Sequence, residues 1–234
     1  MTSIEGAVAL VTGGRRGLGR AYVNALLRHG AVKVYATARK PIPSDDPRIV
    51  AETLDVTYGE SVRSLAERTG DVTIVVNNAG VLISGPPSKA AQVDVRAIFD
   101  TNVFGALRVA QAYAPILASN GGGALVNMHS VFSWASGAGA YGASKAALWS
   151  LTNSLRLELA GQNTHVLGVH AGYIDTEMVA AISASKISPD LVAEKAMEAL
   201  MAGEDEVLVD RITEQAKAAL CGPVAGLALD RLRG

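Results

Sequence analysis

Short apolar runs rich in β-branched residues alternate with longer amphipathic stretches along almost the whole of this 234-residue chain. The runs have the length of buried strands, and the stretches between them have the period of helices. Because the two alternate, we expect a parallel sheet with helices on both faces and right-handed crossovers. The expected strands cover residues 7–12, 32–37, 49–54, 71–76, 124–128, 165–170 and 206–210, and the expected helices cover residues 18–29, 59–68, about 90–119, 141–160 and about 189–201.

The length of the chain suits one large domain, which at this size buries about three quarters of the surface of its unfolded chain. No repeat, low-complexity tract or linker divides the sequence. We therefore expect residues 1–234 to form a single α/β domain. With 21 basic and 22 acidic residues the net charge is −1, which gives no electrostatic reason to expect nucleic acid or an anionic membrane as a partner.

Residues 109–144 contain no charged side chain, a length that could cross a bilayer, but Pro115 and several glycines and asparagines argue for a buried interior instead. The apolar run at residues 7–11 reaches Gly13 too soon for a signal peptide, so we expect a cytoplasmic protein. Cys221 is the single cysteine, which excludes an internal disulfide, and we expect it to be a small buried residue. The histidines show no ligand spacing, so we expect no metal site.

The first expected turn between strand and helix reads Thr12-Gly-Gly-Arg-Arg-Gly-Leu-Gly19. Glycines there permit a tight backbone and close approach of a pyrophosphate, while the following helix supplies free N–H groups and positive potential. The usual Gly-x-Gly-x-x-Gly spacing does not fit, because the glycines of this pattern are Gly13, Gly17 and Gly19. The turn nevertheless predicts binding of a dinucleotide.

Tyr141 and Lys145 lie four residues apart in an expected helix and therefore share one face. A nearby cation favours the phenolate, so this pair can exchange protons near neutral pH. A Tyr-x-x-x-Lys pair alone arises easily by chance. Its weight comes from the other motifs of the chain.

Those motifs are Thr12-Gly-x-x-x-Gly-x-Gly19, Asn77-Asn-Ala-Gly80, Asn102, Ser130 and Tyr141-x-x-x-Lys145. In this order and at these intervals they resemble the classical branch of the short-chain dehydrogenase/reductase family, over about residues 6–178. The resemblance implies a Rossmann-like doubly wound sheet of seven parallel strands. It also implies an enzyme that moves a hydride between a nicotinamide cofactor and a carbonyl or alcohol substrate.

By this resemblance the catalytic residues are Asn102, Ser130, Tyr141 and Lys145. Tyr141 is the general acid in reduction and the base in oxidation, and Lys145 lowers its pKa and bonds the nicotinamide ribose. Ser130 positions the substrate oxygen, and Asn102 holds a water that links Lys145 to solvent. The implied cofactor-binding residues are Gly13, Arg15, Arg16, Gly17, Leu18, Gly19, Arg39, Asp55, Val56, Asn78, Ala79, Gly80, Tyr141, Lys145, Gly172, Ile174 and Thr176.

The choice between the two nicotinamide cofactors follows from charge. A carboxylate at the end of the second strand would hold the ribose hydroxyls of NAD and repel a 2′-phosphate. That strand ends without an acid, and Arg39 follows it; Arg16 can reach the same place, with Arg15 and Lys40 as helpers. These cations predict NADP(H).

The chain departs from the family pattern at three points. Ser130 precedes Tyr141 by 11 residues, about two fewer than usual, with Ser133 and Ser136 as rival serines. His129 stands where a small or apolar residue is common, and we expect it to be packed and hydrogen-bonded. Ala171 replaces the proline of a Pro-Gly pair.

The substrate pocket is expected to lie between residues 82–87, 131–137 and 173–182. Phe132, Trp134, Tyr173 and Met178 give it a mostly apolar lining, which suits an uncharged ketone, aldehyde or secondary alcohol of small to medium size. Three alternatives remain: a non-catalytic NADP-binding redox sensor, a cofactor-independent lyase similar to halohydrin dehalogenases, and a purely structural α/β interaction protein. The resemblance further implies a homodimer or homotetramer through helices that begin near Asn102 and Tyr141, and the apolar positions available for it are Val103, Phe104, Leu107, Leu148, Leu151 and Leu155.

Overall fold

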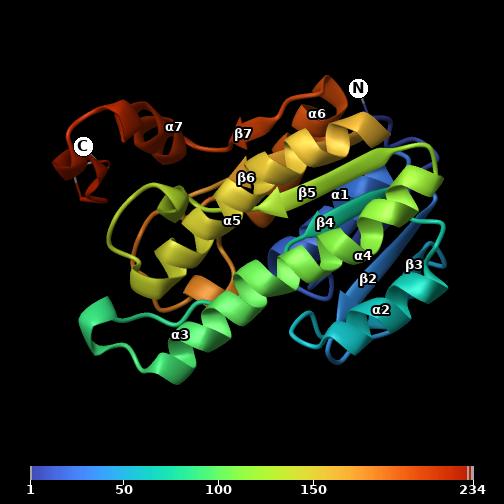
Figure 1. The fold of residues 1–234 in the computed structure, drawn as a ribbon, viewed down its shortest axis with the longest axis horizontal. Coiled ribbons are helices and arrows are strands. Elements are labelled where there is room, and N and C mark those ends of the chain that lie inside the picture. The colour runs from blue at the N-terminus through green and yellow to red at the C-terminus, as the bar shows by residue number, and fades with distance from the viewer. Residues whose placement is uncertain (1, 231, 233–234) are drawn as a thin grey trace.

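The computed structural model describes residues 2–230 and 232 and contains one seven-stranded sheet in the order β3-β2-β1-β4-β5-β6-β7 (Figure 1). Every neighbouring pair of strands is parallel, so the predicted doubly wound architecture is confirmed. The strands are β1 (Val8–Val11), β2 (Lys33–Ala38), β3 (Ile49–Thr53), β4 (Ile74–Asn77), β5 (Gly123–Met128), β6 (Thr164–His170) and β7 (Glu206–Leu208).

Helices cover both faces of the sheet (Figure 1). They are α1 (Gly17–Arg28), α2 (Gly59–Arg68), α3 (Gln92–Phe99), α4 (Ala106–Ser119), α5 (Gly139–Leu159), α6 (Pro189–Ala202) and α7 (Arg211–Ala218). One buried cluster joins α1 and α6 to the sheet and includes the fully buried Tyr22 and Met197. A second joins α2, α4 and the end of α5 to the opposite face, around Leu65 and Tyr113. Burying each such side chain contributes about 1.5–3 kcal/mol.

The order of strands reverses between β1 and β4. From β1 the chain builds outward through β2 and β3, and it then returns to place β4 on the other side of β1. In open sheets of this kind a crevice forms beyond the carboxyl ends of the strands at such a switch point. The glycine-rich turn follows β1 and the Asn78-Ala-Gly80 segment follows β4, so both lie beside that crevice.

Two strands differ from their predicted bounds by more than one residue, for local reasons. Residues 71–73 belong to the turn that follows α2, where the Val72 N–H donates to the Thr69 carbonyl. The last strand stops at Leu208 because Asp210 is the N-cap of α7, its side chain accepting from the Thr213 N–H. Helix α7 was not predicted from the sequence. This reciprocal capping box of Asp210 and Thr213 is the signal that could have found it.

The helix predicted over residues 90–119 is interrupted. Between α3 and α4 lies a π-helical segment, Asp100–Gly105, within what Figure 1 draws as one long rod. Such π-bulges inside α-helices are frequently found at functional sites. This one contains the buried Asn102.

The helices and Cys221 bear on two further expectations from the sequence. Within the part of the chain that the structure describes, no helix is both long enough and apolar enough to cross a membrane. Cys221 is exposed, so the expectation that it is buried was wrong. It lies in the short helical turn Ala219–Cys221 that follows α7 rather than in the core.

Candidate active site

The glycine-rich turn between β1 and α1 has the backbone that the sequence predicted. Gly13 and Gly17 have φ values of +68° and +53°, which residues with a Cβ rarely adopt. Gly19 is required for space instead, because a Cβ there would overlap the Gly13 carbonyl oxygen. The turn therefore leaves its backbone open to a ligand that approaches from the carboxyl edge.

Thr12 joins this turn to the segment that follows β4. Its Oγ1 accepts hydrogen bonds from the N–H groups of Asn78 and Ala79, both at 2.9 Å. The Asn78 Nδ2 donates to the Thr12 carbonyl oxygen at 2.9 Å. The two walls of the switch-point crevice are thus fastened to each other. Thr12 belongs to the motif recognised in the sequence, but no role was predicted for it.

The N-terminus of α1 can receive an anion. The helix begins at Gly17, and the side chain of its N-cap, Arg16, makes no capping hydrogen bond. The first turn, all of which the structure describes, contains no acidic residue. Free N–H groups and the positive end of the helix dipole suit a pyrophosphate, so these residues fit the phosphates of a dinucleotide.

Of the arginines expected near the end of β2, Arg15 and Arg39 lie there and Arg16 does not. Arg15 Nη1 donates to the Lys40 carbonyl oxygen at 3.1 Å, which brings it to the end of β2. Arg39 lies close enough to Asp55 to contribute to lowering the pKa of that carboxyl, although hydrogen bonding from Thr57 is the largest cause. Arg16, expected at the same place, instead forms an ion pair with Glu177. Arg15 is therefore the better placed companion of Arg39.

The remaining predicted cofactor residues lie around the same edge. Val56 is buried, and a Cβ on Gly105 would meet its side chain at 2.7 Å. A Cβ on Gly80 would lie 3.3 Å from Asn102 Oδ1. The Asp55 carboxylate accepts from the N–H and Oγ1 of Thr57 at 3.0 and 2.7 Å.

The segment after β6 closes the crevice from the other side. The Gly172 N–H donates to Asp210 Oδ2 at 2.8 Å, and Ile174 forms an isolated bridge with Ile187. A Cβ on Gly17 would meet the Thr176 side chain at 3.3 Å. The two ends of the predicted nucleotide site, which are far apart in the sequence, therefore lie side by side.

Asn102 connects the π-helical segment to both neighbouring elements. Its Oδ1 accepts from the Val81 N–H at 2.8 Å, and its Nδ2 donates to the Val81 carbonyl at 3.0 Å and to Ser144 Oγ at 3.1 Å. Ser144 in turn donates to the Tyr141 carbonyl at 2.7 Å. Asn102 is thus linked, through one serine, to the turn of α5 that carries Tyr141.

Lys145 and Tyr141 project from the first turns of α5 toward the end of β5. Lys145 is 5% exposed, and its Nζ donates to the Met128 carbonyl oxygen at 2.8 Å. The same Nζ lies 5.8 Å from the centre of the Tyr141 ring. Burial lowers the pKa of Lys145 to about 8. The buried ammonium is therefore close to losing its proton just above neutral pH.

The pKa of Tyr141 differs from the expectation. Burial raises it to about 12, and a hydrogen bond with Ser130 opposes that rise. We expected Lys145 to lower it, but in this structure desolvation of the phenol is the dominant effect. Tyr141 is therefore a protonated phenol at neutral pH.

Ser130 stands where β5 ends and a short 3-10 turn, Val131–Ser133, begins. Its Oγ accepts from the Phe132 N–H at 3.2 Å, and the residue is 5% exposed. An Oγ that accepts in this way keeps its own O–H free to donate. Of the three serines considered, Ser130 is the one that approaches Tyr141.

Two residues near Ser130 lie differently from the sequence prediction. His129 is packed, as expected, but neither ring nitrogen has a hydrogen-bond partner among residues 2–230 and 232. Trp134, expected to line the substrate pocket, is 7% exposed and belongs to a third buried cluster with Ala216 and Leu232. Phe132 lies edge-on to both Tyr141 and Tyr173, with centroids 6.3 and 5.9 Å away.

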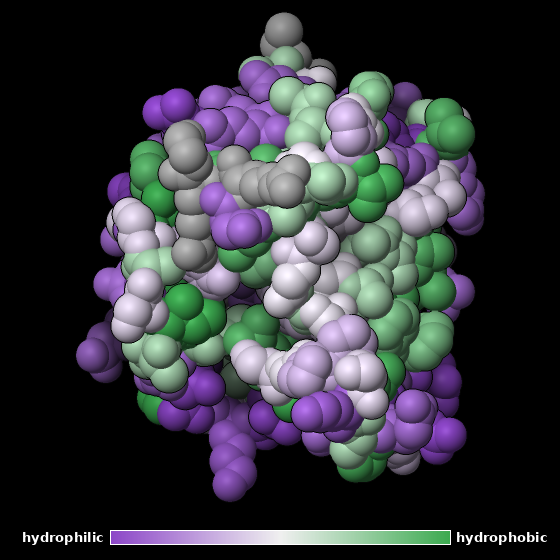
Figure 2. Space-filling model, turned by 90° about the vertical axis from the view of Figure 1, so that its left-hand side faces the viewer, coloured by the Kyte–Doolittle hydropathy of each residue, from purple (hydrophilic) through white to green (hydrophobic). Residues whose placement is uncertain are grey.

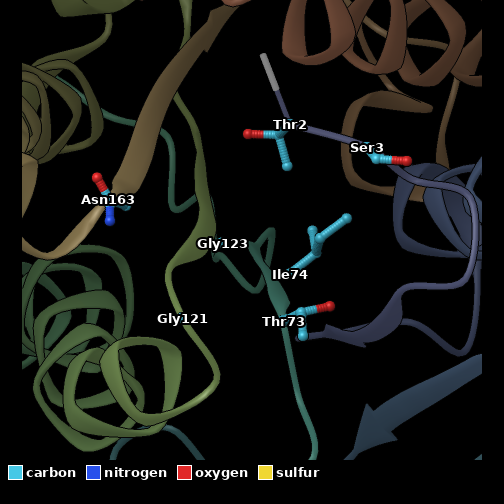
Figure 3. Close-up of a pocket in the computed structure, with 7 residues that line it drawn as sticks. All are labelled: Thr2, Ser3, Thr73, Ile74, Gly121, Gly123 and Asn163. Atoms are coloured by element: carbon cyan, nitrogen blue, oxygen red, sulfur yellow. The ribbon is translucent and has the colours of Figure 1, made fainter.

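The two edges of the sheet differ in chemistry. Figure 2 views the side toward which the β5 arrow points in Figure 1; green and white residues fill its middle, and most purple residues lie around its rim. At the amino ends of the strands lies a hollow of about 320 Å³ between Thr73, Gly123 and Asn163 (Figure 3). None of the residues that line this hollow carries a charged side chain, and all the predicted site residues lie at the other edge.

The comparisons with known proteins agree with this geometry. A family model described as short chain dehydrogenase matches residues 7–187. An uncharacterised oxidoreductase of Staphylococcus saprophyticus is 32% identical over 220 residues, which cover 86% of this chain and 93% of that protein. A ketoacyl reductase of Nostoc is 27% identical over 257 residues, with 99% and 90% covered.

A solved structure supplies a geometric parallel. It is a short chain dehydrogenase from Burkholderia cenocepacia in complex with NADP, 36% identical, with a TM-score of 0.92 over 98% of this chain and 99% of that chain. Fold, motif order and sequence similarity all lead to one assignment: this chain belongs to the short chain dehydrogenase family.

Proposed function

We propose that the protein is an NADP(H)-dependent oxidoreductase that interconverts a carbonyl group and an alcohol on a small to medium, mainly hydrophobic substrate. The observation that carries the proposal is the meeting of Ser130, Tyr141 and Lys145 at the carboxyl edge of the sheet, beside a glycine turn open to a dinucleotide. A purely structural role does not require this combination of residues.

The cofactor is proposed to be NADP(H), held by the residues of the crevice. The N-terminus of α1 and the glycines before it would take the pyrophosphate, and Arg39 and Arg15 would take the 2′-phosphate. The Burkholderia cenocepacia relative was solved with NADP, which supports this choice. When bound, the nicotinamide supplies or accepts the hydride.

Tyr141 is proposed to transfer the proton. In reduction its phenol O–H donates to the substrate oxygen as the carbonyl carbon receives the hydride, so that the C=O group becomes CH–OH. With a pKa of about 12 the phenol holds its proton at neutral pH, which suits the acid of a reduction. Lys145, charged below about pH 8, would stabilise the phenolate that remains until solvent returns the proton.

Ser130 is proposed to hold the substrate oxygen next to Tyr141. Its Oγ accepts from the Phe132 N–H, and its O–H, which faces Tyr141 in this structure, would donate to the substrate oxygen as well. A fixed donor aimed at an oxygen that gains negative charge lowers the barrier of the reaction. Asn102 would support the proton path from Lys145, through the Ser144 contact that joins it to α5.

The substrate is proposed to be uncharged near its carbonyl. Phe132 and Tyr173 stand beside Tyr141, and the middle of that face of the molecule is hydrophobic to neutral (Figure 2). The Nostoc relative is a ketoacyl reductase, which makes keto esters sensible first probes. We propose that the protein is located in the cytoplasm.

Self-association is proposed as well, through the helices that contain Phe104 and Leu151. Phe104 is 50% exposed, and Leu107 and Leu151 are partly exposed, so these three could contact a second copy. Val103, Leu148 and Leu155 are buried within the protomer and contribute to its own packing.

The test is turnover with NADPH and a panel of benzaldehyde, acetophenone, cyclohexanone and ethyl acetoacetate, followed by absorbance of the reduced nicotinamide. We expect oxidation of NADPH with at least one member and slower oxidation of NADH. Tyr141→Phe should bind NADPH with unchanged affinity and lose turnover by at least about a hundredfold, since it removes the proton donor.

The outcomes separate the alternatives. Binding of NADPH without turnover of any carbonyl would favour the redox sensor, and absence of nucleotide binding would favour the lyase. Substantial turnover by Tyr141→Phe would remove Tyr141 from the mechanism.

A further inference from the structure

Behind Ser130 lies a group of buried and half-buried aromatic and charged side chains that the proposed mechanism does not use. We call it the His170 cluster. Its members are His129, Trp134, Trp149, His170, Glu206 and Lys217. They come from β6, β7, α5, α7, the position directly after β5 and the turn after Ser130.

The ring of His170 is held on both faces. His129 stacks on it with centroids 4.6 Å apart and an interplanar angle of 26°, and Trp134 stacks on it at 4.0 Å and 16°. The residue has no exposed surface. Gly168 makes room for this arrangement, because a Cβ there would lie 3.1 Å from the His129 ring.

Both ring nitrogens of His170 face oxygen atoms. Nδ1 lies 3.3 Å from the carbonyl oxygen of Ser130, and Nε2 lies 3.1 Å from Glu206 Oε1, an ion-pair distance without hydrogen-bond alignment. A carbonyl oxygen can only accept, so Nδ1 must donate in this contact. The same carbonyl accepts from the Ser133 N–H at 2.9 Å, which fills both of its acceptor positions.

Glu206 is itself fixed by two further donors. Trp149 Nε1 donates to Oε1 at 3.0 Å, and Lys217 Nζ donates to Oε2 at 2.6 Å. Burial raises the pKa of Glu206, but the close contact with His170 and the hydrogen bond from Lys217 outweigh burial and lower that pKa to about 2. A permanent carboxylate therefore faces His170, where it favours the protonated ring against the opposing effect of burial.

We propose that His170, oriented by Glu206, is a positioning residue for Ser130. It donates from Nδ1 to the Ser130 carbonyl and so fixes the peptide from which the Ser130 hydroxyl projects. His170 and Glu206 are separated from Ser130 by 40 and 76 residues in the sequence, and they fasten the short turn after Ser130 to β6 and β7. This inference rests on the proposed function of Ser130.

Two substitutions of His170 test the roles of its two ring nitrogens separately. In His170→Asn, the side-chain Nδ2 takes the place of Nδ1 and keeps the donor to Ser130. In His170→Gln, the longer side chain places its amide near Nε2, facing Glu206, and gives up the donor to Ser130. Both variants replace the imidazole by an uncharged amide, so both lose the ring stacking with His129 and Trp134.

We expect His170→Asn to keep most of the wild-type kcat, and His170→Gln to lose at least about tenfold, because a displacement of about 1 Å can cost up to about a hundredfold. The assay uses NADPH and the carbonyl compound of the panel that wild-type enzyme reduces fastest. The Kd for NADPH should be unchanged in both variants, and their melting temperatures should fall by similar amounts. Equal kcat values for the two variants would overturn the proposal, since a purely structural role predicts no difference.

Glu206→Gln gives a second test through a double-mutant cycle. It should lower kcat in the wild-type background and leave kcat unchanged in the His170→Asn background, because Glu206 acts through the imidazole. An equal loss in both backgrounds would refute the proposal. Asp205→Asn is the matched control, since Asp205 neighbours Glu206 but is exposed and faces Arg156; its kcat should be that of wild type.

Crystal structures of the two His170 variants test the inference without turnover. The Ser130 carbonyl and hydroxyl should keep their positions in His170→Asn and move in His170→Gln. An unmoved Ser130 in His170→Gln would overturn the positioning role even if no carbonyl of the panel is reduced. Failure of wild-type turnover, in contrast, would count against the proposed function alone.

Discussion

At the scale of single residues, the candidate site depends on groups whose charge is set by burial. Tyr141 keeps its proton because desolvation raises its pKa, and Lys145 is close to losing its own because desolvation lowers its pKa. Burial thus moves the two pKa values in opposite directions, the arrangement by which a site assigns one group as acid and another as its electrostatic support. Outside the site, Arg39 and Arg15 are the residues on which the choice of cofactor depends.

Replacement of Arg39 by alanine tests that choice. We expect Arg39→Ala to weaken NADPH binding by about tenfold to a hundredfold, the value of one charge-assisted hydrogen bond of roughly 1.5–3 kcal/mol. Binding of NADH, which lacks the 2′-phosphate, should change little. Fluorescence titration with both nucleotides measures the ratio.

Arg63→Ala is the control for that titration, because Arg63 is an exposed arginine on α2 that pairs with Glu60. It should leave both affinities unchanged. A wild-type preference for NADH would contradict the assignment of NADP(H).

At the scale of elements, the glycine turn and the π-helical segment shape the crevice, but the sequence predicts them unequally. The turn follows from its glycines, since Gly13 and Gly17 adopt the positive φ that their positions imply. The π-helical segment was not predicted, because it covers only six residues, Asp100–Gly105, and is continued by helix on both sides. The His170–Glu206 contact was missed for a different reason: it joins β6 and β7 side by side, and no local pattern encodes which side chains meet across a sheet.

Gly19→Ala tests the turn as an element. The added methyl group would overlap the Gly13 carbonyl, and overpacking of this kind costs about 1–3 kcal/mol. We expect a lower melting temperature together with at least tenfold weaker NADPH binding, since displacement of the Gly13 peptide should alter the surface offered to the pyrophosphate.

Gly161→Ala serves as the comparison, because nothing lies within 4 Å of a Cβ at that position. Its stability and affinity should match the wild type. If Gly19→Ala behaved in the same way, the close packing between the turn and α1 would have no energetic importance.

At the scale of the whole molecule, the site has a cost in stability. Lys145 is buried and its Nζ donates to the Met128 carbonyl oxygen, and its pKa falls from 10.5 to about 8. Between these two pH values the unfolded chain binds more protons than the folded one, so the free energy of unfolding rises with pH there. Below about pH 8 the cost is present in full.

Lys145→Met should therefore be inactive but more stable than wild type near pH 7, by at most about 3 kcal/mol. The gain should shrink as the pH approaches about 10, where wild-type Lys145 is already neutral. Urea unfolding at the two pH values measures it.

Lys195→Met is the matched control for this measurement. Lys195 also donates to a backbone carbonyl, that of Val209 at 2.8 Å, but it is only partly buried. Its replacement should give a smaller gain in stability near pH 7, because its side chain loses less of its hydration on folding. A Lys145→Met variant that is less stable than wild type near pH 7 would show that the hydrogen bond to Met128 outweighs the desolvation.

The contact between Ser136 and Leu227 bears on how the enzyme is made. The Ser136 N–H donates to the Leu227 carbonyl at 2.8 Å, and Leu232 packs in the same buried cluster as Phe132. The 91 residues between Ser136 and Leu227 take roughly 5–20 seconds to synthesise at ordinary ribosomal rates. On a translating ribosome the glycine turn can therefore fold early. The loop beyond Ser130 cannot pack fully until Leu227 and Leu232 have been synthesised. A nascent protein would therefore form its nucleotide site before its catalytic site.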